Sequence, residues 1–116
     1  MSSVERRDHT TGFEVRTSVE ADRVVVALAG ECDLASRAAL TEALLAAVER
    51  APVVIVDLGA LRFLDSSGLH GLVTAYRAAH ERGGRLQAVN AGGTVATVLA
   101  VTGLDGLLQP PAGDND

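Results

Sequence analysis

The sequence is poor in aromatic residues and contains no lysine, and each shortage excludes a class of protein. Aromatic residues make up 3% of the 116 positions and tryptophan is absent, so the chain offers no stacking platform for single-stranded nucleic acid. All ten basic residues are arginine and the formal net charge is −5. This negative charge disfavours sequence-independent binding to DNA phosphates. We therefore expect no direct contact with nucleic acid.

The scarcity of cysteine and of long apolar runs indicates where in the cell the protein is located. Cys32 is the only cysteine, so no intramolecular disulfide forms and a reducing environment fits. Segment 1–10 contains four charged residues and no apolar core, which is not the pattern of a signal peptide. No apolar stretch approaches the roughly 20 residues that span a bilayer. We expect a cytoplasmic protein with no membrane partner.

The length corresponds to about one domain, which at this size folds without metals or disulfides. The hydrophobic fraction is 47%, and with so few aromatics the core must consist of valine, leucine and alanine. We expect flexible tails at 1–11 and 109–116, and one domain at 12–108 between them.

Hydrophobic periodicity predicts strands that alternate with helices. Alternating or β-branched apolar runs predict strands at 13–17, 24–29, 53–58 and 85–90, and a last short strand at 107–108. Apolar residues three and four positions apart predict helices at 34–51, 66–82 and 92–102. The continuous run 53–58 is typical of a strand that is covered on both faces or buried centrally.

The predicted order ββαβαβα indicates an α/β fold. Its first two strands form a hairpin, and the later strands are joined by helices and therefore run parallel. The sequence thus predicts a small mixed β-sheet, made of the opening hairpin plus parallel strands, with packed α-helices.

The segment from Leu61 to Leu69 is the most distinctive part of the chain. Asp65, Ser66 and Ser67 lie between a buried strand and a helix, where free backbone N–H groups and the helix dipole favour anions. A phosphate on Ser66 would add about −1.5 to −2 charges beside Asp65, and the helix itself would tolerate it. A reversible switch requires this combination of an intact fold and a changed surface.

A simpler interpretation is that Ser66 only caps the helix, because serine is a preferred N-cap. A capping box would place Glu or Gln three residues after the cap, but Leu69 and His70 stand at the nearby positions. Asp33 or Ser36 has the same capping role available at the start of the preceding helix.

Other constellations are weaker candidates for chemistry. A Ser–His hydrolase needs an orienting acid and an oxyanion hole, and the chain has no G-x-S-x-G elbow. The three histidines lack zinc-like spacing, and the Gly92-Gly93-Thr94 loop lacks the lysine of a P-loop. Cys32 is expected to pack as a small apolar residue, and Asp57 to accept loop N–H bonds. We expect no catalytic residue, metal or cofactor, and hence no enzyme.

Four segments, in their order and spacing, resemble the STAS family and within it the bacterial anti-sigma factor antagonists. The resemblance runs from about Phe13 to Leu108. It rests on a G-E-x-D segment, a central strand, a D-S-S-G-L phosphorylation motif and a closing T-G-L, which stand at 30–34, 54–58, 63–69 and 102–104. Each segment is common by chance, but the combination is specific.

The resemblance implies a function and a set of residues. In the family, the first serine after the motif aspartate is phosphorylated, and here that serine is Ser66, not Ser67. The kinase is the partner anti-sigma factor, which uses its own ATP. Unphosphorylated antagonist binds the anti-sigma factor and frees the sigma factor; phosphorylated antagonist lets go, and a phosphatase resets it. Asp33, Asp65, Ser67 and Gly68 match family positions near the partner-facing surface.

His70 departs from the family pattern, in which glycine is usual at this position. One turn into the helix and facing Ser66, it is expected to alter the fit of the partner. Two other classes of function remain open: a non-switching STAS scaffold or accessory subunit of a transporter or signalling complex, and a small-ligand binder or enzyme. An accessible hydroxyl at Ser66 favours the switched antagonist, since an unswitched scaffold does not need one.

Overall fold

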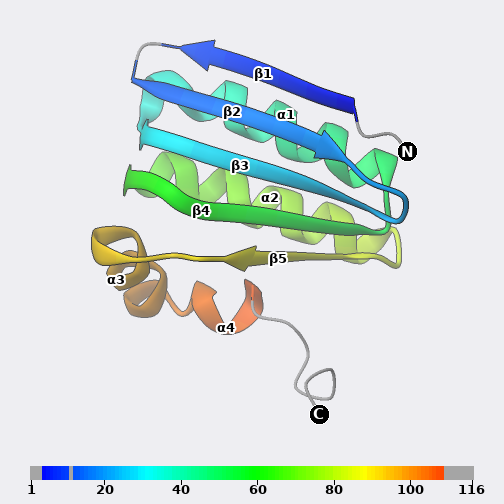
Figure 1. Cartoon of the computed structure of the whole chain (residues 1–116). Coiled ribbons are helices and arrows are strands. Elements are labelled where there is room, and N and C mark those ends of the chain that lie inside the picture. Colours follow the sequence, from blue (N-terminus) through cyan, green and yellow to red (C-terminus); the bar gives the residue numbers. More distant parts are fainter. Residues whose placement is uncertain (1–3, 11, 109–116) are drawn as a thin grey trace.

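The chain forms one five-stranded mixed sheet, and α1 and α2 lie behind it in Figure 1. The structure, a computed structural model, describes residues 4–10 and 12–108, with side chains from residue 12 onward. The strands are β1 Val4–Thr10, β2 Phe13–Val19, β3 Arg23–Cys32, β4 Val53–Leu64 and β5 Arg85–Val89. The helices are the short 3-10 helix η1 Leu34–Ser36, then α1 Arg37–Arg50, α2 Ser66–Glu81, α3 Gly93–Thr102 and α4 Leu104–Leu108.

The strands lie in the sheet in their chain order, β1-β2-β3-β4-β5. β1, β2 and β3 are antiparallel neighbours, whereas β3, β4 and β5 are parallel and are joined by α1 and α2. The predicted order ββαβαβα and the mixed sheet are confirmed, with a strand added at the start and a short helix at the end. No helix in the described part of the chain is long and apolar enough to cross a membrane.

β1 lies where the sequence predicted a flexible tail. It pairs with β2 along its whole length, from Val4 opposite Val19 to Thr10 opposite Phe13. The sequence of β1 is almost entirely polar and carries no alternating apolar pattern, so its pairing depends on backbone hydrogen bonds to the edge of β2. The predicted tail at 109–116 lies outside the described residues.

Three other predicted boundaries are wrong. β4 continues past residue 58, because a register shift after Asp57 moves its buried positions to Leu61 and Leu64 and ends the simple alternation. The helix predicted at 34–51 divides into η1 and α1. The strand predicted at 107–108 is part of α4, which begins directly after Gly103 ends α3 in a left-handed conformation at φ 80°.

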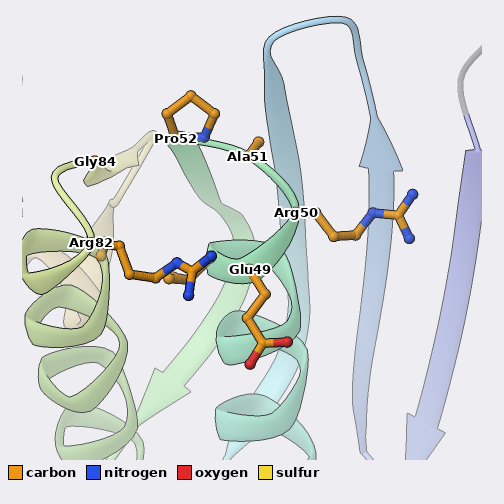
Figure 2. A pocket seen from close by; sticks show the side chains of 8 residues that line it. Glu49, Arg50, Ala51, Pro52, Arg82 and Gly84 are labelled. Carbon is orange, nitrogen blue, oxygen red and sulfur yellow. The ribbon is translucent and has the colours of Figure 1, made fainter.

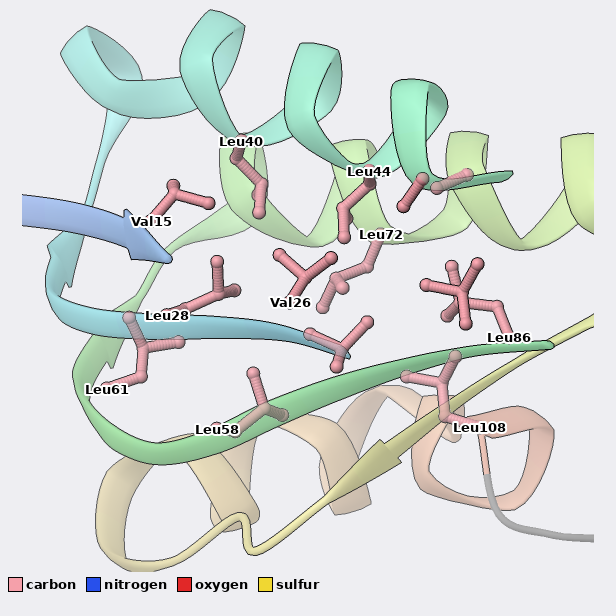
Figure 3. Packing of buried hydrophobic residues seen from close by; sticks show 14 of the residues in the cluster. Val15, Val26, Leu28, Leu40, Leu44, Leu58, Leu61, Leu72, Leu86 and Leu108 are labelled. Atoms are coloured by element: carbon pink, nitrogen blue, oxygen red, sulfur yellow. The ribbon is translucent and has the colours of Figure 1, made fainter. Parts of the chain in front are cut away.

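The core lies between the sheet and the two long helices (Figure 3). Val26 and Leu28 of β3 face Leu40 and Leu44 of α1 and Leu72 of α2, and all five are fully buried. Each such side chain contributes about 1.5–3 kcal/mol on leaving water. Valine, leucine and alanine dominate this core, as the shortage of aromatics predicts.

The sheet and helices together determine where loops from distant parts of the chain meet. α1 and α2 both follow the carboxyl end of a strand, so both begin at the same end of the molecule and both end at the other (Figure 1). β5 stops pairing with β4 at Val89 opposite Asp57, and α3 packs beside the remaining half of β4. The carboxyl ends of β3 and β4 are therefore framed by the starts of two helices.

Candidate functional site

Two adjacent strands end together and bring two loops side by side. β3 and β4 pair as far as Cys32 opposite Leu64, and the backbone N–H of Asp65 donates to the carbonyl oxygen of Cys32 at 3.2 Å. Asp33 and Asp65 follow these strands directly and stand at the starts of η1 and α2. We call residues 31–36 and 62–70 the Ser66 end of the molecule.

Asp65 is the N-cap of α2. Its backbone is extended, with φ −100° and ψ −172°, and its Oδ1 accepts hydrogen bonds from the N–H of Ser67 at 2.9 Å and of Gly68 at 3.2 Å. Its carbonyl oxygen accepts the first helical bond, from the N–H of Leu69 at 3.0 Å. One side chain thus satisfies two of the four N–H groups that a helix start leaves free.

Ser66 is the first residue of α2, and it does not cap the helix. Its side chain is exposed, and within the described part of the chain its hydroxyl makes no hydrogen bond. The interpretation of Ser66 as a mere cap is therefore wrong, because Asp65 occupies that role. The hydroxyl stands free at the positive end of the helix dipole.

Asp33 performs the same task at η1. Its Oδ1 accepts from the N–H of Ala35 at 3.1 Å, from the N–H of Ser36 at 3.3 Å and from the Ser36 hydroxyl at 3.2 Å. Asp33, and not Ser36, is the capping residue, so the choice that the sequence left open is decided. Ser36 is buried, and its hydroxyl donates a hydrogen bond to Asp33.

Ser67 and Gly68 are less accessible than the sequence prediction implied. Ser67 is half-buried and Gly68 is buried. A Cβ atom at Gly68 would collide with the side chain of Leu64 and would lie 3.0 Å from the Sγ of Cys32. Gly68 therefore lets α2 approach the ends of β3 and β4, and any part it has in binding comes through the shape of this turn.

Cys32 lies beneath the two aspartates and is fully buried. Burial, and to a smaller extent the negative charges of Asp65 and then Asp33, together raise the pKa of its thiol to about 11. The thiol is consequently protonated near neutral pH and packs as a small apolar group.

His70 lies one turn along α2 from Ser66 and is exposed. Its carbonyl oxygen accepts from the Thr74 hydroxyl at 2.9 Å. The side chains of Ser66 and His70 are both exposed, and both lie on the solvent side of the first two turns of α2. Whether His70 contacts a partner stays a prediction.

The Ser66 end also carries exposed side chains that the sequence analysis did not single out. Leu34 is 69% exposed and Phe63 is 42% exposed, although large apolar residues are usually buried. Phe63 stands opposite Glu31 in the strand register, and Glu31 forms a long ion pair of 3.9 Å with Arg62. The available signal was an aromatic residue beside the motif in a chain that has only three.

The opposite end of the molecule is hollowed. A pocket of about 240 Å³ lies where α1 and α2 end, and it is lined by residues of the segments 48–52 and 79–84. Figure 2 shows Arg82 and Glu49 beside this hollow, with Arg50 pointing away from it. We call this region, defined by residues 48–52 and 82–84, the Pro52 end. It lies a whole strand length away from Ser66.

The chain belongs to the STAS domain family. The family model described as "Mlab, STAS domain" matches residues 15–109, a range that includes both loops of the Ser66 end. A search of curated proteins finds no match.

Solved structures of anti-sigma factor antagonists share this fold. The crystal structure of an anti-sigma factor antagonist from Mycobacterium paratuberculosis is 28% identical, with a TM-score of 0.68 over 97% of this chain and 90% of that one. SpoIIAA in its unphosphorylated form is 21% identical, with a TM-score of 0.69 over 96% and 91%. The Bacillus cell fate determinant SpoIIAA in its phosphorylated form is 20% identical, with a TM-score of 0.63 over 96% and 95%. The predicted resemblance and the α/β fold are confirmed.

Proposed function

We propose that this protein is an anti-sigma factor antagonist that is switched by phosphorylation of Ser66. In the unphosphorylated state it binds an anti-sigma factor with serine kinase activity, which then releases its sigma factor. Phosphorylation by that kinase ends the binding, and a phosphatase acting on phospho-Ser66 restores it. The observation that carries the proposal is the arrangement at the start of α2. Asp65 caps the helix, so the Ser66 hydroxyl is exposed and takes no part in the cap.

The position of Ser66 allows a phosphate without loss of the fold. A negative charge in the first turn of a helix is stabilised by about 0.3–1 kcal/mol through the helix dipole, and α2 has 16 residues. The cap bonds of Asp65 run to the backbone of Ser67 and Gly68, so they do not depend on the Ser66 side chain. Both chemical states of Ser66 are compatible with the same backbone.

The same phosphate changes the surface sharply. The unphosphorylated Ser66 end combines a neutral hydroxyl with the exposed apolar side chains of Leu34 and Phe63. Phosphorylation adds about −1.5 to −2 charges beside the carboxylates of Asp33 and Asp65. A partner that fits the neutral surface must then desolvate an unmatched dianion, which costs several kcal/mol. Each 1.4 kcal/mol weakens binding about tenfold.

The six residues proposed for partner contact have different parts in this mechanism. Ser66 carries the switch, and Asp33 and Asp65 hold the two loops in place. Ser67 and Gly68 shape the first turn of α2, and His70 extends the exposed surface by one helical turn. Since the kinase is the partner, the protein itself needs no catalytic group.

The comparisons support this assignment in two ways. The antagonist from Mycobacterium paratuberculosis covers nearly the whole chain at 28% identity. The fold of this protein also matches SpoIIAA in its unphosphorylated and its phosphorylated forms, so one STAS fold accommodates both states in that protein.

Capture from the native lysate tests the proposal. The bait is the Ser66→Ala protein, which keeps a neutral surface and cannot be phosphorylated, and it is compared with a Ser66→Asp bait. We expect Ser66→Ala to retain an ATP-binding partner that Ser66→Asp does not retain. A non-switching STAS scaffold or accessory subunit would retain the same partner on both baits, and this result would overturn the proposed switch.

A further inference from the structure

Ser66 and His70 stand four residues apart at the start of α2, and both side chains are exposed. Side chains at this spacing lie one above the other on the same face of a helix, with Cβ atoms about 5–6 Å apart. Within the described part of the chain, neither side chain makes a hydrogen bond or an ion pair. Each is therefore free to pair with the other once both carry a charge.

The order of the two residues along the helix favours such a pair. An acidic group that stands four residues before a basic one stabilises a helix more than the reverse order does. A phosphate on Ser66 would lie in the first turn of α2, where the helix dipole favours a negative charge. His70 is the fifth residue of α2, beyond the first turn, in which the dipole opposes a cation. Both positions thus agree with the polarity of the helix.

The carboxylate at this helix start does not compete for His70. Asp65 stands five residues before His70, and this spacing places the two side chains on different faces of the helix. The Asp65 carboxylate is also half-buried, and it accepts the N–H bonds of Ser67 and Gly68 at 2.9 Å and 3.2 Å. A phosphate on Ser66 is therefore the anion of this turn that is best placed to meet the imidazole.

The segments around His70 carry charged groups of both signs. The first two turns of α2 pack on η1, on α1 and on the ends of β3 and β4. The charged side chains of these segments are Glu31, Asp33, Arg37, Glu42 and Arg62, and α2 itself adds Asp65 before His70 and Arg77 after it. All of these groups are present in both states of Ser66. A difference between the two states in the titration of this end therefore comes from the phosphate.

We propose that His70 is the intramolecular partner of a phosphate on Ser66, and that this pair makes the charge of the phosphorylated Ser66 end depend on pH. The inference rests on the proposed phosphorylation and adds a regulator to it. A histidine gains its proton near pH 6.5, and a phosphoserine gains its second proton near pH 6. The two groups together carry about −2 charges at pH 8 and about −1 at pH 6, whereas a phosphate alone keeps about −1.5 at pH 6.

The pair has a consequence for the release of the anti-sigma factor. At slightly alkaline pH the imidazole is neutral, and the full charge of the phosphate opposes binding. At mildly acidic pH the charged imidazole offsets part of the phosphate, so the phosphorylated protein regains part of its affinity. Phosphorylation of Ser66 is thus a complete off signal above neutral pH and a graded one below it.

Phosphorus NMR titration of the full chain tests the pair. Phosphoserine is installed at position 66 during synthesis of the protein, so the measurement needs neither a kinase nor a partner. The phosphate should lose its second proton at a pH about 0.3 units or more lower in the wild type than in His70→Gln, because a charged imidazole favours the dianion. In His70→Arg, which is charged at every pH of the titration, this midpoint should be at least as low as in the wild type.

His80→Gln is the matched control, because it removes the same ring from the far end of α2, about 20 Å along the helix from Ser66. Like His70, His80 is exposed, so both variants should stay folded, and His80→Gln should leave the phosphate midpoint unchanged. Equal midpoints in the wild type and His70→Gln overturn the inference. So does an equal shift in His80→Gln, which would come from net charge alone. Neither result bears on the proposed function, which the kinase and partner experiments test separately.

Discussion

The two ends of the molecule are built from the same helices with opposite polarity. At the Ser66 end α2 begins and η1 leads into α1, and Asp33 and Asp65 satisfy the free N–H groups. At the Pro52 end both helices finish, and the side chains around the hollow include Arg82 and Glu49. Helix starts favour anions and helix ends favour cations, so a phosphate is tolerated at one end and opposed by the dipole at the other.

Glycine allows close approach at both ends, but the neighbours differ. A Cβ atom at Gly84 would collide with the backbone of Pro52, whereas one at Gly68 would meet the side chains of Leu64 and Cys32. The Pro52 end is thus fixed by contact between two backbones, and the Ser66 end by packing of a helix on strand ends.

The largest expected difference between the ends is in partner binding. Ser66→Asp should weaken the affinity for the anti-sigma factor by about 100-fold or more, since an unmatched charge in an interface costs several kcal/mol. Arg50→Gln changes the net charge by the same amount at the exposed Pro52 end, and it should leave the affinity within about twofold. Calorimetric titration with the captured partner measures both. Equal losses in the two variants would show that net charge, and not position, governs binding.

The packing of Gly68 predicts a loss of stability. Gly68→Ala forces a methyl group against Leu64 and Cys32, and overpacking of this kind costs about 1–3 kcal/mol. In Gly106→Ala the new methyl group meets nothing within 4 Å, so the helix should gain up to about 1 kcal/mol. Chemical denaturation measures the free energy of unfolding of each variant. If both substitutions stabilise the protein, the close approach of α2 to the strand ends is refuted.

The thiol beneath the aspartates predicts a pH effect that is specific to this end. The pKa of Cys32 is raised from an ordinary 9.0 to about 11, so above pH 9 the unfolded chain loses a proton that the folded chain keeps. Stability should therefore fall between pH 9 and 11, by about 1.4 kcal/mol at pH 10. Cys32→Ala should lose this part of the alkaline slope, as measured by urea unfolding at pH 8 and pH 10. An unchanged slope in the variant would contradict the buried environment.

The smallest expected effect concerns the cap. Asp65→Ala should cost about 1 kcal/mol of stability, because it removes the acceptor of two N–H bonds. Asp65→Asn keeps the acceptor and removes the charge, so its melting temperature should stay close to that of the wild type. If Asp65→Ala also melts like the wild type, Ser66 is able to take over the cap, and the division of roles between these residues is not fixed.

Periodicity predicted most of the fold, and it failed where backbone contacts decide the structure. The β-branched run at 53–58 correctly predicted a strand. The continuation of this strand to Leu64 depends on a register shift that no side-chain pattern predicts. β1 also could not be predicted from periodicity, because its polar residues pair with β2 through backbone groups. α4 replaced a predicted strand, since two leucines in sequence fit either a strand or a short helix.

The candidate site was predicted in outline. The motif from Asp65 to Gly68 located the turn that carries the proposed switch, but sequence alone could not decide whether Asp65 or Ser66 caps α2, because both are preferred caps. The structure decides it through the two bonds to the Asp65 carboxylate. The exposure of Leu34 and Phe63 was missed, because apolar residues beside a motif are ordinarily assigned to the core.

Mapping the phosphorylated residue tests the central claim most directly. The protein is incubated with the captured anti-sigma factor and ATP, and the modified site is identified by mass spectrometry of the wild type and of the Ser66→Ala and Ser67→Ala variants. The account predicts one phosphate, on Ser66, in the wild type and in Ser67→Ala, and none in Ser66→Ala. Phosphate on Ser67 alone, or no phosphate from a partner whose binding is confirmed, would contradict it.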